Sequence, residues 1–228
     1  MSEKTVIDKQ YFDKNGLNLH AVFNLSELPA NLIAEQSSHF SQLLLFAHGG
    51  KQLWSSLNTS GFQSENPVDD FSVQVVKSYF KKQLPDTQYK FVYPGNSSIS
   101  LIALGNLAGW HFESPFKVGI NNVWGSWFAY RVAILANTHY QTTPKADYSS
   151  PCITCAAKPC KSACPANALE QDDFIFDKCV KYRKGAESRC KRTCLSRVTC
   201  PIASNHQYTD EQLHYHYSVS LKTIQKYY

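Results

Sequence analysis

The sequence predicts a mixed α/β (α+β) domain followed by a small module built around cysteines. Strand-length apolar runs alternate with amphipathic helical patterns between residues 17 and 137. A polar, proline-bounded segment follows at residues 141–151, and all eight cysteines lie within residues 152–200. We therefore expect three parts along the chain: an α/β domain over residues 1–148, a cysteine module over residues 149–205 and a C-terminal helical tail over residues 206–228.

Composition limits the class of protein. The 228 residues are 43% hydrophobic and 13% aromatic, which is enough for a substantial core. No uninterrupted apolar run is long enough to span a bilayer, and residues 1–16 lack the apolar segment of a signal peptide. We therefore expect a cytoplasmic protein with no membrane partner. In that compartment thiols stay reduced, so clustered cysteines favour metal binding over disulfides.

The first predicted strand covers residues 17–25, which alternate in hydrophobicity after a short helical lead-in. Residues 42–48 form a continuous apolar run that ends in two glycines. This pattern predicts a buried strand, a glycine turn and a helix starting near Lys51. His48 lies at the end of the run, where it either lines a site or has a structural role.

Two helices have clear signals at their ends. Residues 67–84 carry Pro67 and two aspartates at the start and Lys81 and Lys82 near the end, which suits the helix dipole. Apolar residues along this segment form one stripe, as in an amphipathic helix. Thr209, followed by acidic residues, predicts a short terminal helix with a capping signal.

The middle of the chain is less regular. Residues 89–93 predict a strand, and residues 94–96 a turn. A helix is expected over residues 97–108, capped by a serine and ending near a glycine. Residues 109–128 predict loops and turns with aromatic anchors, and residues 126–137 are a buried helix or strand.

Positive charge is concentrated in the C-terminal part of the chain. Residues 1–148 carry 11 basic and 11 acidic side chains, whereas residues 149–228 carry 12 and 7, which accounts for the whole net charge of +5. Eight basic residues lie between Lys178 and Arg197 against one acidic residue, Glu187. This segment is either a solvated loop without a specific role, or its positive charge stabilises a reduced cluster, or it steers an acidic redox partner or a polyanion to the protein.

The cysteines form two runs, each closed by a Cys-Pro step. Their patterns are C-x2-C-x4-C-x3-C-P and C-x10-C-x3-C-x5-C-P. In bacterial two-cluster ferredoxins the fourth cysteine of a similar run binds the other cluster. The same crossing here supplies four ligands to each of two [4Fe–4S] clusters. The first quartet is then Cys152, Cys155, Cys160 and Cys200. The second quartet is Cys164, Cys179, Cys190 and Cys194.

Zinc is the alternative metal, because four-cysteine zinc sites also begin with C-x2-C. The two Cys-Pro steps and the three-residue gap before Cys164 favour iron–sulfur clusters. The four-residue gap after Cys155 and the five-residue gap after Cys194 are longer than the usual iron–sulfur spacing. Two zinc sites, or a single cluster, therefore stay open beside two clusters.

The chain resembles the epoxyqueuosine reductase family over roughly residues 17–202. The motifs that carry the resemblance are Ala108-Gly109-Trp110, Ile120-Asn121, Gly125-Ser126-Trp127-Phe128 and the two cysteine runs. The family is more distantly related to reductive dehalogenases. The resemblance implies a nitroreductase-like, corrinoid-binding type of domain before a ferredoxin-like double-cluster module. It also implies cobalamin as a cofactor, with the clusters delivering electrons one at a time to its cobalt.

The resemblance also implies site residues. The position of the family's aspartate proton donor falls at Tyr93, and a tyrosine is also able to donate a proton, as in reductive dehalogenases. A packed aromatic is the alternative role for Tyr93. The family motifs place Asn121, Ser126 and Trp127 among the cofactor-binding residues.

Two differences from the family bear on the substrate. The segment between the first two strands is shorter, and the C-terminal helical-repeat extension is absent. Because both bear on tRNA binding, we do not expect tRNA or another nucleic acid as a partner.

The leading functional hypothesis is an iron–sulfur oxidoreductase that passes electrons through two [4Fe–4S] clusters to a site in the α/β domain. Its partners would be a low-potential electron donor of flavodoxin or ferredoxin type and an unidentified small-molecule substrate. The alternative is a ferredoxin-type electron-transfer protein without catalytic activity of its own. A third hypothesis is a nucleic-acid-binding module that uses the basic segment from Lys178 to Arg197.

Overall fold

The computed structural model describes residues 5–29, 32, 39–95, 99–170 and 173–228. Contacts divide the chain into two compact units. Unit 1 consists of residues 1–110 and 128–147, and unit 2 of residues 111–127 and 148–228. Residues 111–127 thus group with the cysteines in space, although the sequence places them in the first domain. The division into three domains stays a prediction.

Unit 1 contains a four-stranded antiparallel sheet in the order β1-β2-β6-β3. Strand β2 is buried along its whole length, which explains its continuous apolar sequence. The three predicted strands are confirmed, and the segment at residues 126–137, a helix or a strand from its pattern, is a strand. The strands are β1 (Leu19–Asn24), β2 (Gln42–Gly49), β3 (Tyr89–Tyr93) and β6 (Phe128–Ala136).

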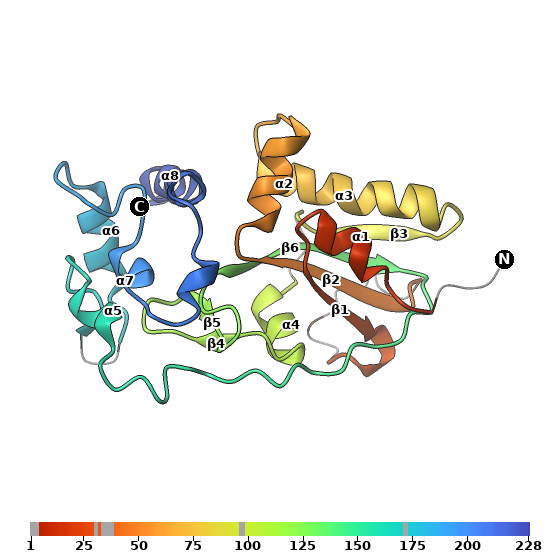
Figure 1. The fold of residues 1–228 in the computed structure, drawn as a ribbon, viewed down its shortest axis with the longest axis horizontal. Coiled ribbons are helices and arrows are strands. Elements are labelled where there is room, and N and C mark those ends of the chain that lie inside the picture. Colours follow the sequence, from red (N-terminus) through yellow and green to blue (C-terminus); the bar gives the residue numbers. More distant parts are fainter. Residues whose placement is uncertain (1–4, 30–31, 33–38, 96–98, 171–172) are drawn as a thin grey trace. The chain divides into compact units, whose positions relative to one another are not determined.

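Helices cover both faces of this sheet (Figure 1). Phe12 packs against Phe46 of β2 and Tyr79, with ring centroids 4.6 and 4.7 Å apart. Gly105 of the helix at residues 101–107 lies against Tyr130. Tyr130 pairs with Ala47, which follows Phe46 in β2, so Tyr130 faces the side of the sheet opposite to Phe46. Three helices on one face are α1 (Lys9–Lys14), α2 (Gln52–Ser60) and α3 (Pro67–Gln83), and α4 (Leu101–Leu107) lies on the other.

The predicted helix ends agree with the structure. Pro67 begins α3, and Lys81 and Lys82 lie in its last turn. At the start of α4 the Ser100 hydroxyl accepts a hydrogen bond from the Ala103 amide at 3.2 Å. Gly109 follows α4 with a φ of 76°, a conformation that favours glycine. Residues 96–98, where the turn and this helix are predicted to meet, lie outside the described residues.

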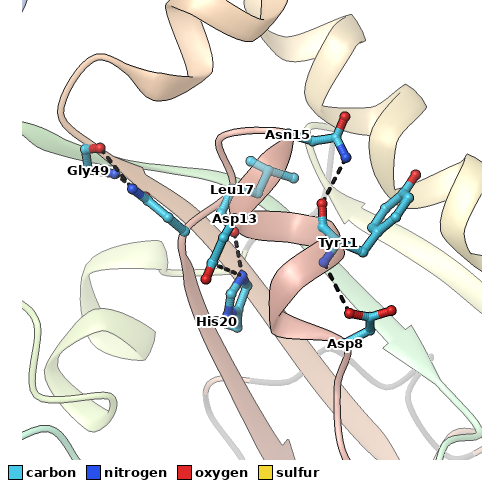
Figure 2. Close-up of polar contacts among 8 residues, drawn as sticks. Asp8, Tyr11, Asp13, Asn15, Leu17, His20 and Gly49 are labelled. Carbon is cyan, nitrogen blue, oxygen red and sulfur yellow. Dashed lines mark hydrogen bonds and ion pairs between the residues drawn. The ribbon is translucent and has the colours of Figure 1, made fainter.

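Side-chain hydrogen bonds fix the N-terminal helix α1 (Figure 2). The Asp8 carboxylate accepts from the Tyr11 amide at 3.0 Å and caps the helix start. The Asn15 amide donates to the Tyr11 carbonyl at 2.8 Å near the helix end. The Tyr11 hydroxyl donates to the Val75 carbonyl of α3 at 3.0 Å. Helix α1 is therefore attached to α3 as well as to the sheet.

Unit 2 is built from a two-stranded hairpin, several short helices and the longer C-terminal helix α8. Residues 111–127 are tied to the cysteine segment by hydrogen bonds between Asn122 and Ser149 of 3.1 and 2.9 Å. The terminal helix begins after its predicted Thr209 cap but has 18 residues, so the expectation of a short helix is wrong. The elements are β4 (Phe112–Glu113), β5 (Gly119–Ile120), α5 (Pro159–Ser162), α6 (Phe176–Lys184), α7 (Leu195–Val198) and α8 (Asp210–Tyr227).

None of the described helices is long and apolar enough to cross a bilayer.

Replacing Gly16 by alanine is expected to destabilise unit 1 strongly. Gly16 has a φ of 84°, and a Cβ atom there would lie 2.3 Å from the Leu53 Cα of α2. Gly61→Ala is the control, because Gly61 has a similar φ of 67° with nothing within 4 Å. We expect a loss of about 1 kcal/mol for Gly61→Ala and about 3 kcal/mol for Gly16→Ala, measured by hydrogen exchange of the β2 amides. Equal losses would contradict the close approach.

Unit 1 is expected to lose stability as the pH falls through the range in which His20 titrates. Burial lowers the pKa of His20 from 6.5 to about 4, although its Nε2 contacts the Leu17 carbonyl and lies 3.5 Å from an Asp13 carboxylate oxygen (Figure 2). Asp13 is half exposed, so solvent screens its charge. Between pH 6.5 and 4 the unfolded chain therefore binds the proton more readily than the folded one.

The free energy of unfolding should accordingly fall by about 3 kcal/mol across this range. The measurement is the difference between wild type and His20→Gln in β2 hydrogen-exchange protection, with the His20 pKa followed by imidazole NMR. A His20 that titrates near pH 6.5 in the folded chain would contradict the prediction.

Candidate functional site

The eight cysteines line two separate cavities in unit 2. All four members of the second quartet line a cavity of about 530 Å³, and all four members of the first quartet line a smaller one of about 20 Å³. Cys164 therefore lies with cysteines of the other run, and so does Cys200. The structure brings the thiols together in the two sets that the crossed pattern predicts. Their role as metal ligands stays a prediction.

Electrostatic interactions among the thiols follow the same grouping. Burial raises the pKa of Cys152, and the neighbouring thiols that raise it further all belong to the first quartet. Burial raises the pKa of Cys179 to about 11, and the thiols that add to this rise are those of the second quartet. Without a metal the thiols of Cys152 and Cys179 are protonated at neutral pH, so a bound metal would have to displace their protons.

The described residues contain no group of three or more His, Cys, Asp or Glu side chains placed to hold a single metal ion. The donor set of each quartet is four cysteines, which is the set that holds a [4Fe–4S] cluster. The larger cavity has room around its thiols, whereas the smaller one would have to open to admit a cluster.

Short helices and core residues hold the two quartets in place. Cys160 lies in α5, Cys179 in α6, and Cys194 is the N-cap of α7. Cys160 and Cys200 pack in one apolar cluster with Phe116, Ile120 and Leu169, so residues 111–127 form one wall of the first cavity. Residues of α8, among them Tyr217 and Ile224, form a wall of the second.

Asn121, Ser126 and Trp127, the predicted cofactor-binding residues, are fully buried in unit 2. The Asn121 side chain accepts from the Val123 and Trp124 amides at 3.0 and 2.7 Å. The Ser126 hydroxyl accepts from Arg197. Of these three side chains, Trp127 is the one with a buried polar atom, its indole Nε1, that has no hydrogen-bond partner among the described residues. Asn121 and Ser126 are thus engaged within their own unit, and the cofactor role of all three stays a prediction.

Tyr93, the predicted proton donor, lies half-buried at the end of β3, in a group of polar side chains of unit 1. His48 accepts a 3.0 Å hydrogen bond at Nδ1 from the Arg131 Nε. Arg131 also donates from Nη1 to the Asp69 carboxylate at 3.2 Å. Burial raises the pKa of Tyr93; the charge of Asp69 raises it further, and that of Arg131 opposes the rise.

Arg131 and Tyr93 both lie at irregularities in the strand pairing of the sheet. Phe46 pairs with Val132 and Ala47 with Tyr130, so Arg131 is an extra residue in β6. The pairing of β3 with the opposite edge of β6 has a second register shift, between Phe91 and Tyr93. Bulges of this kind re-aim side chains and are common next to active sites.

The cluster of Tyr93 with Arg131, His48 and Asp69 is suited to donating a proton from the Tyr93 phenol. With a raised pKa, the phenol of Tyr93 is protonated at neutral pH, as a proton donor must be. The guanidinium of Arg131 would stabilise the phenolate that forms when the proton leaves. His48 and Asp69 hold that guanidinium from two sides.

Sequence reasoning did not predict Asp69 or Arg131 as site residues. Asp69 lies in the first turn of α3, where an acidic residue is explained by the helix dipole alone. Arg131 did leave a signal, because it is the one charged residue within the apolar segment of β6. A charge inside a buried strand requires a polar partner.

Three solved structures illustrate a shared fold. An epoxyqueuosine reductase with an epoxyqueuosine-modified tRNA-Tyr stem loop has 12% sequence identity and a TM-score of 0.55, covering 90% of this chain and 66% of that one. The epoxyqueuosine reductase from Streptococcus thermophilus has 15% identity and a TM-score of 0.52, covering 85% and 64%. A catabolic reductive dehalogenase has 13% identity and a TM-score of 0.53, covering 92% and 33%.

The chain therefore has the mixed helix-and-sheet fold of epoxyqueuosine reductases and reductive dehalogenases, which are redox enzymes. It spans about two thirds of the reductases and one third of the dehalogenase. No protein-family model and no curated protein sequence matches the chain.

Asp69→Asn is expected to lower the pKa of Tyr93 relative to wild type, and Arg131→Gln is expected to raise it. Both follow from the sign of the charge removed near the phenol. The measurement is a pH titration by NMR of chains labelled with ¹³C at tyrosine Cζ, with Tyr93→Phe to assign the signal. Asp70→Asn is the control, because Asp70 is the exposed neighbour of Asp69. Equal effects of the two asparagine variants would contradict the placement of Tyr93.

Proposed function

We propose that this protein is an iron–sulfur oxidoreductase resembling epoxyqueuosine reductase, in which two [4Fe–4S] clusters pass electrons to a site in the α/β domain. The observation that carries the proposal is the sorting of eight thiols into two cavities, each lined by a complete cysteine quartet. Four thiolates are the donor set of such a cluster. The likeness of the fold to that of known redox enzymes supports the same function.

Cobalamin is the second cofactor that this proposal includes. One structural neighbour is described as a reductive dehalogenase with a B12-dependent mechanism. When bound, cobalamin would supply a strongly reducing cobalt centre. The unpartnered Nε1 of Trp127 is a donor that a bound group could engage, whereas Asn121 and Ser126 are already engaged. The roles given to the protein's own residues below do not depend on cobalamin.

Tyr93 is the proposed proton donor to a small-molecule substrate. Its phenol is protonated at neutral pH, and the positive charge of Arg131 would stabilise the phenolate after the proton has left. His48 and Asp69 are positioning residues that act through Arg131. In this role the protein supplies the proton that accompanies substrate reduction, and the clusters supply the electrons.

The proposed electron donor is an acidic, low-potential protein of flavodoxin or ferredoxin type. Exposed basic residues on α6 and the following loop flank Cys179 and Cys190 of the second quartet in the sequence. They are Lys178, Lys181, Lys184, Arg189 and Arg192. Complementary charge would steer such a donor to this part of unit 2 and would make association faster at low ionic strength. A cytoplasmic location suits reduced thiols and such a donor.

A ferredoxin-type carrier without its own reaction is the second candidate. The internal contacts of Asn121 and Ser126 favour it, because these side chains are not free to bind a cofactor. Titration of the anaerobic, iron-loaded chain with cobalamin separates the two candidates. Retention of the corrinoid with a change in its absorption spectrum would support the reductase. Two clusters and no corrinoid binding would favour the carrier.

Pairs of cysteine substitutions test the two clusters and their crossed ligands together. The wild-type chain, reconstituted anaerobically, should contain about eight iron and about eight acid-labile sulfide. Cys164→Ala with Cys179→Ala removes two ligands of one quartet, so about half of the iron should remain. Cys160→Ala with Cys164→Ala removes one ligand from each quartet and should leave almost none.

The opposite result for the two pairs would show that each cysteine run holds its own cluster. Zinc in place of iron, with no sulfide, would contradict the proposed function itself. Far-UV circular dichroism of each variant serves as the control for folding.

A further inference from the structure

Two arginines of the basic segment are buried in unit 2. Arg183 of α6 and Arg197 of α7 are each 7% exposed, whereas most of the basic residues around them are exposed. Neither arginine contacts a carboxylate among the described residues. A buried charge without an opposite charge is costly, so the two guanidinium groups require an explanation.

Arg183 lies in the wall of the second cavity. It is one helical turn after Cys179 and lines the cavity together with the whole second quartet. Its Nε donates to the Cys190 carbonyl at 3.1 Å, and its charge acts on the thiols of Cys179 and Cys190. The positive charge is therefore held beside cysteines of one quartet.

Helix α8 fixes the orientation of this guanidinium. Arg183 donates from Nη1 to the Ser220 hydroxyl and from Nη2 to the Tyr217 carbonyl, both at 3.0 Å. Its guanidinium carbon lies 5.4 Å from the centre of the Tyr217 ring. Each of its three nitrogens thus donates a hydrogen bond to a neutral group, so these contacts leave its charge uncompensated.

Arg197 has a different set of neutral partners. It hydrogen-bonds to both the carbonyl and the hydroxyl of Ser126, and its guanidinium carbon lies 4.6 Å from the Trp127 ring centre. The hydroxyls of Tyr208 and Tyr217 complete its partners. Burial raises the pKa of Tyr217 to about 12, so this phenol is neutral and compensates neither arginine. Arg197 does not line the cavity, so Arg183 is the buried cation on its surface.

We infer that Arg183 is a redox-tuning residue of the second quartet: its buried charge stabilises the one-electron-reduced state of the cluster there. This inference rests on the proposed function, because it requires a cluster on these four cysteines. Reduction adds one electron, and hence one negative charge, to a cluster that is already anionic. A fixed positive charge in a low-dielectric wall favours that step and raises the reduction potential.

Among the described residues that line the cavity of the first quartet there is no equivalent buried cation. Lys158 is the basic residue that lines its cavity, and this lysine is half-exposed, so solvent screens its charge. The second cluster should therefore be the more easily reduced of the two. Electrons that enter the protein would collect on the cluster that Arg183 and α8 enclose.

The test is a redox titration with dithionite, followed by EPR, on the full-length chain that keeps only the second cluster through Cys155→Ala and Cys160→Ala. Arg183→Met and Arg183→Gln should each lower the ratio of reduced to oxidised cluster at a fixed potential about tenfold, which corresponds to about 59 mV. Arg183→Lys keeps the charge and should restore most of the ratio. Two controls should leave it unchanged: Arg192→Met removes an exposed charge, and Ser220→Ala removes a helix contact without removing charge.

An unchanged potential in Arg183→Met or Arg183→Gln, with the iron content intact, would overturn the inference. If neither variant holds the cluster, the two clusters of chains with intact Arg183 are compared instead. A second cluster that is reduced more easily than the first supports the inference, and the reverse order overturns it. A wild-type chain that binds no iron overturns the proposed function and this inference with it, whereas a loaded cluster with an unchanged potential overturns this inference alone.

Discussion

The crossing of Cys164 and Cys200 is the constraint on which the rest of unit 2 depends. Neither cavity is completed by one cysteine run, because each run supplies its last cysteine to the other quartet. The two runs must therefore fold as one body, whatever metal they hold. Residues of the 111–127 segment line both cavities, and helix α8 closes the second. Metal binding and the folding of unit 2 would then be strongly coupled.

Charge is arranged differently in the two units. In unit 1, Arg131 is paired with the Asp69 carboxylate and with His48, so a largely buried charge has a local partner beside Tyr93. In unit 2, Arg183 has only neutral partners among the described residues. The first arrangement suits proton transfer by a neighbouring phenol. The second would be balanced by thiolates on a metal cluster, which is the state that the proposed function requires.

Local signals in the sequence predicted most helices and strands, but they could not predict contacts between residues that are distant in the sequence. Proline, aspartate and lysine positions placed α3 to within one residue, and the analogy with two-cluster ferredoxins predicted which thiols share each cavity. The packing of residues 111–127 with the cysteines depends on contacts such as that between Asn122 and Ser149, which have no periodic signature. Likewise, Arg183 looks like any other member of a basic run, because its burial depends on α8, more than thirty residues away.

The most direct test of the central claim is Mössbauer spectroscopy of the full-length chain reconstituted with ⁵⁷Fe under anaerobic conditions. Two four-iron clusters predict that all of the iron gives the signal of diamagnetic, oxidised [4Fe–4S] centres, with sulfide equal to iron. Reduction should convert this signal to that of paramagnetic clusters. Iron present as isolated high-spin ions, or quartets filled by zinc, would contradict the account.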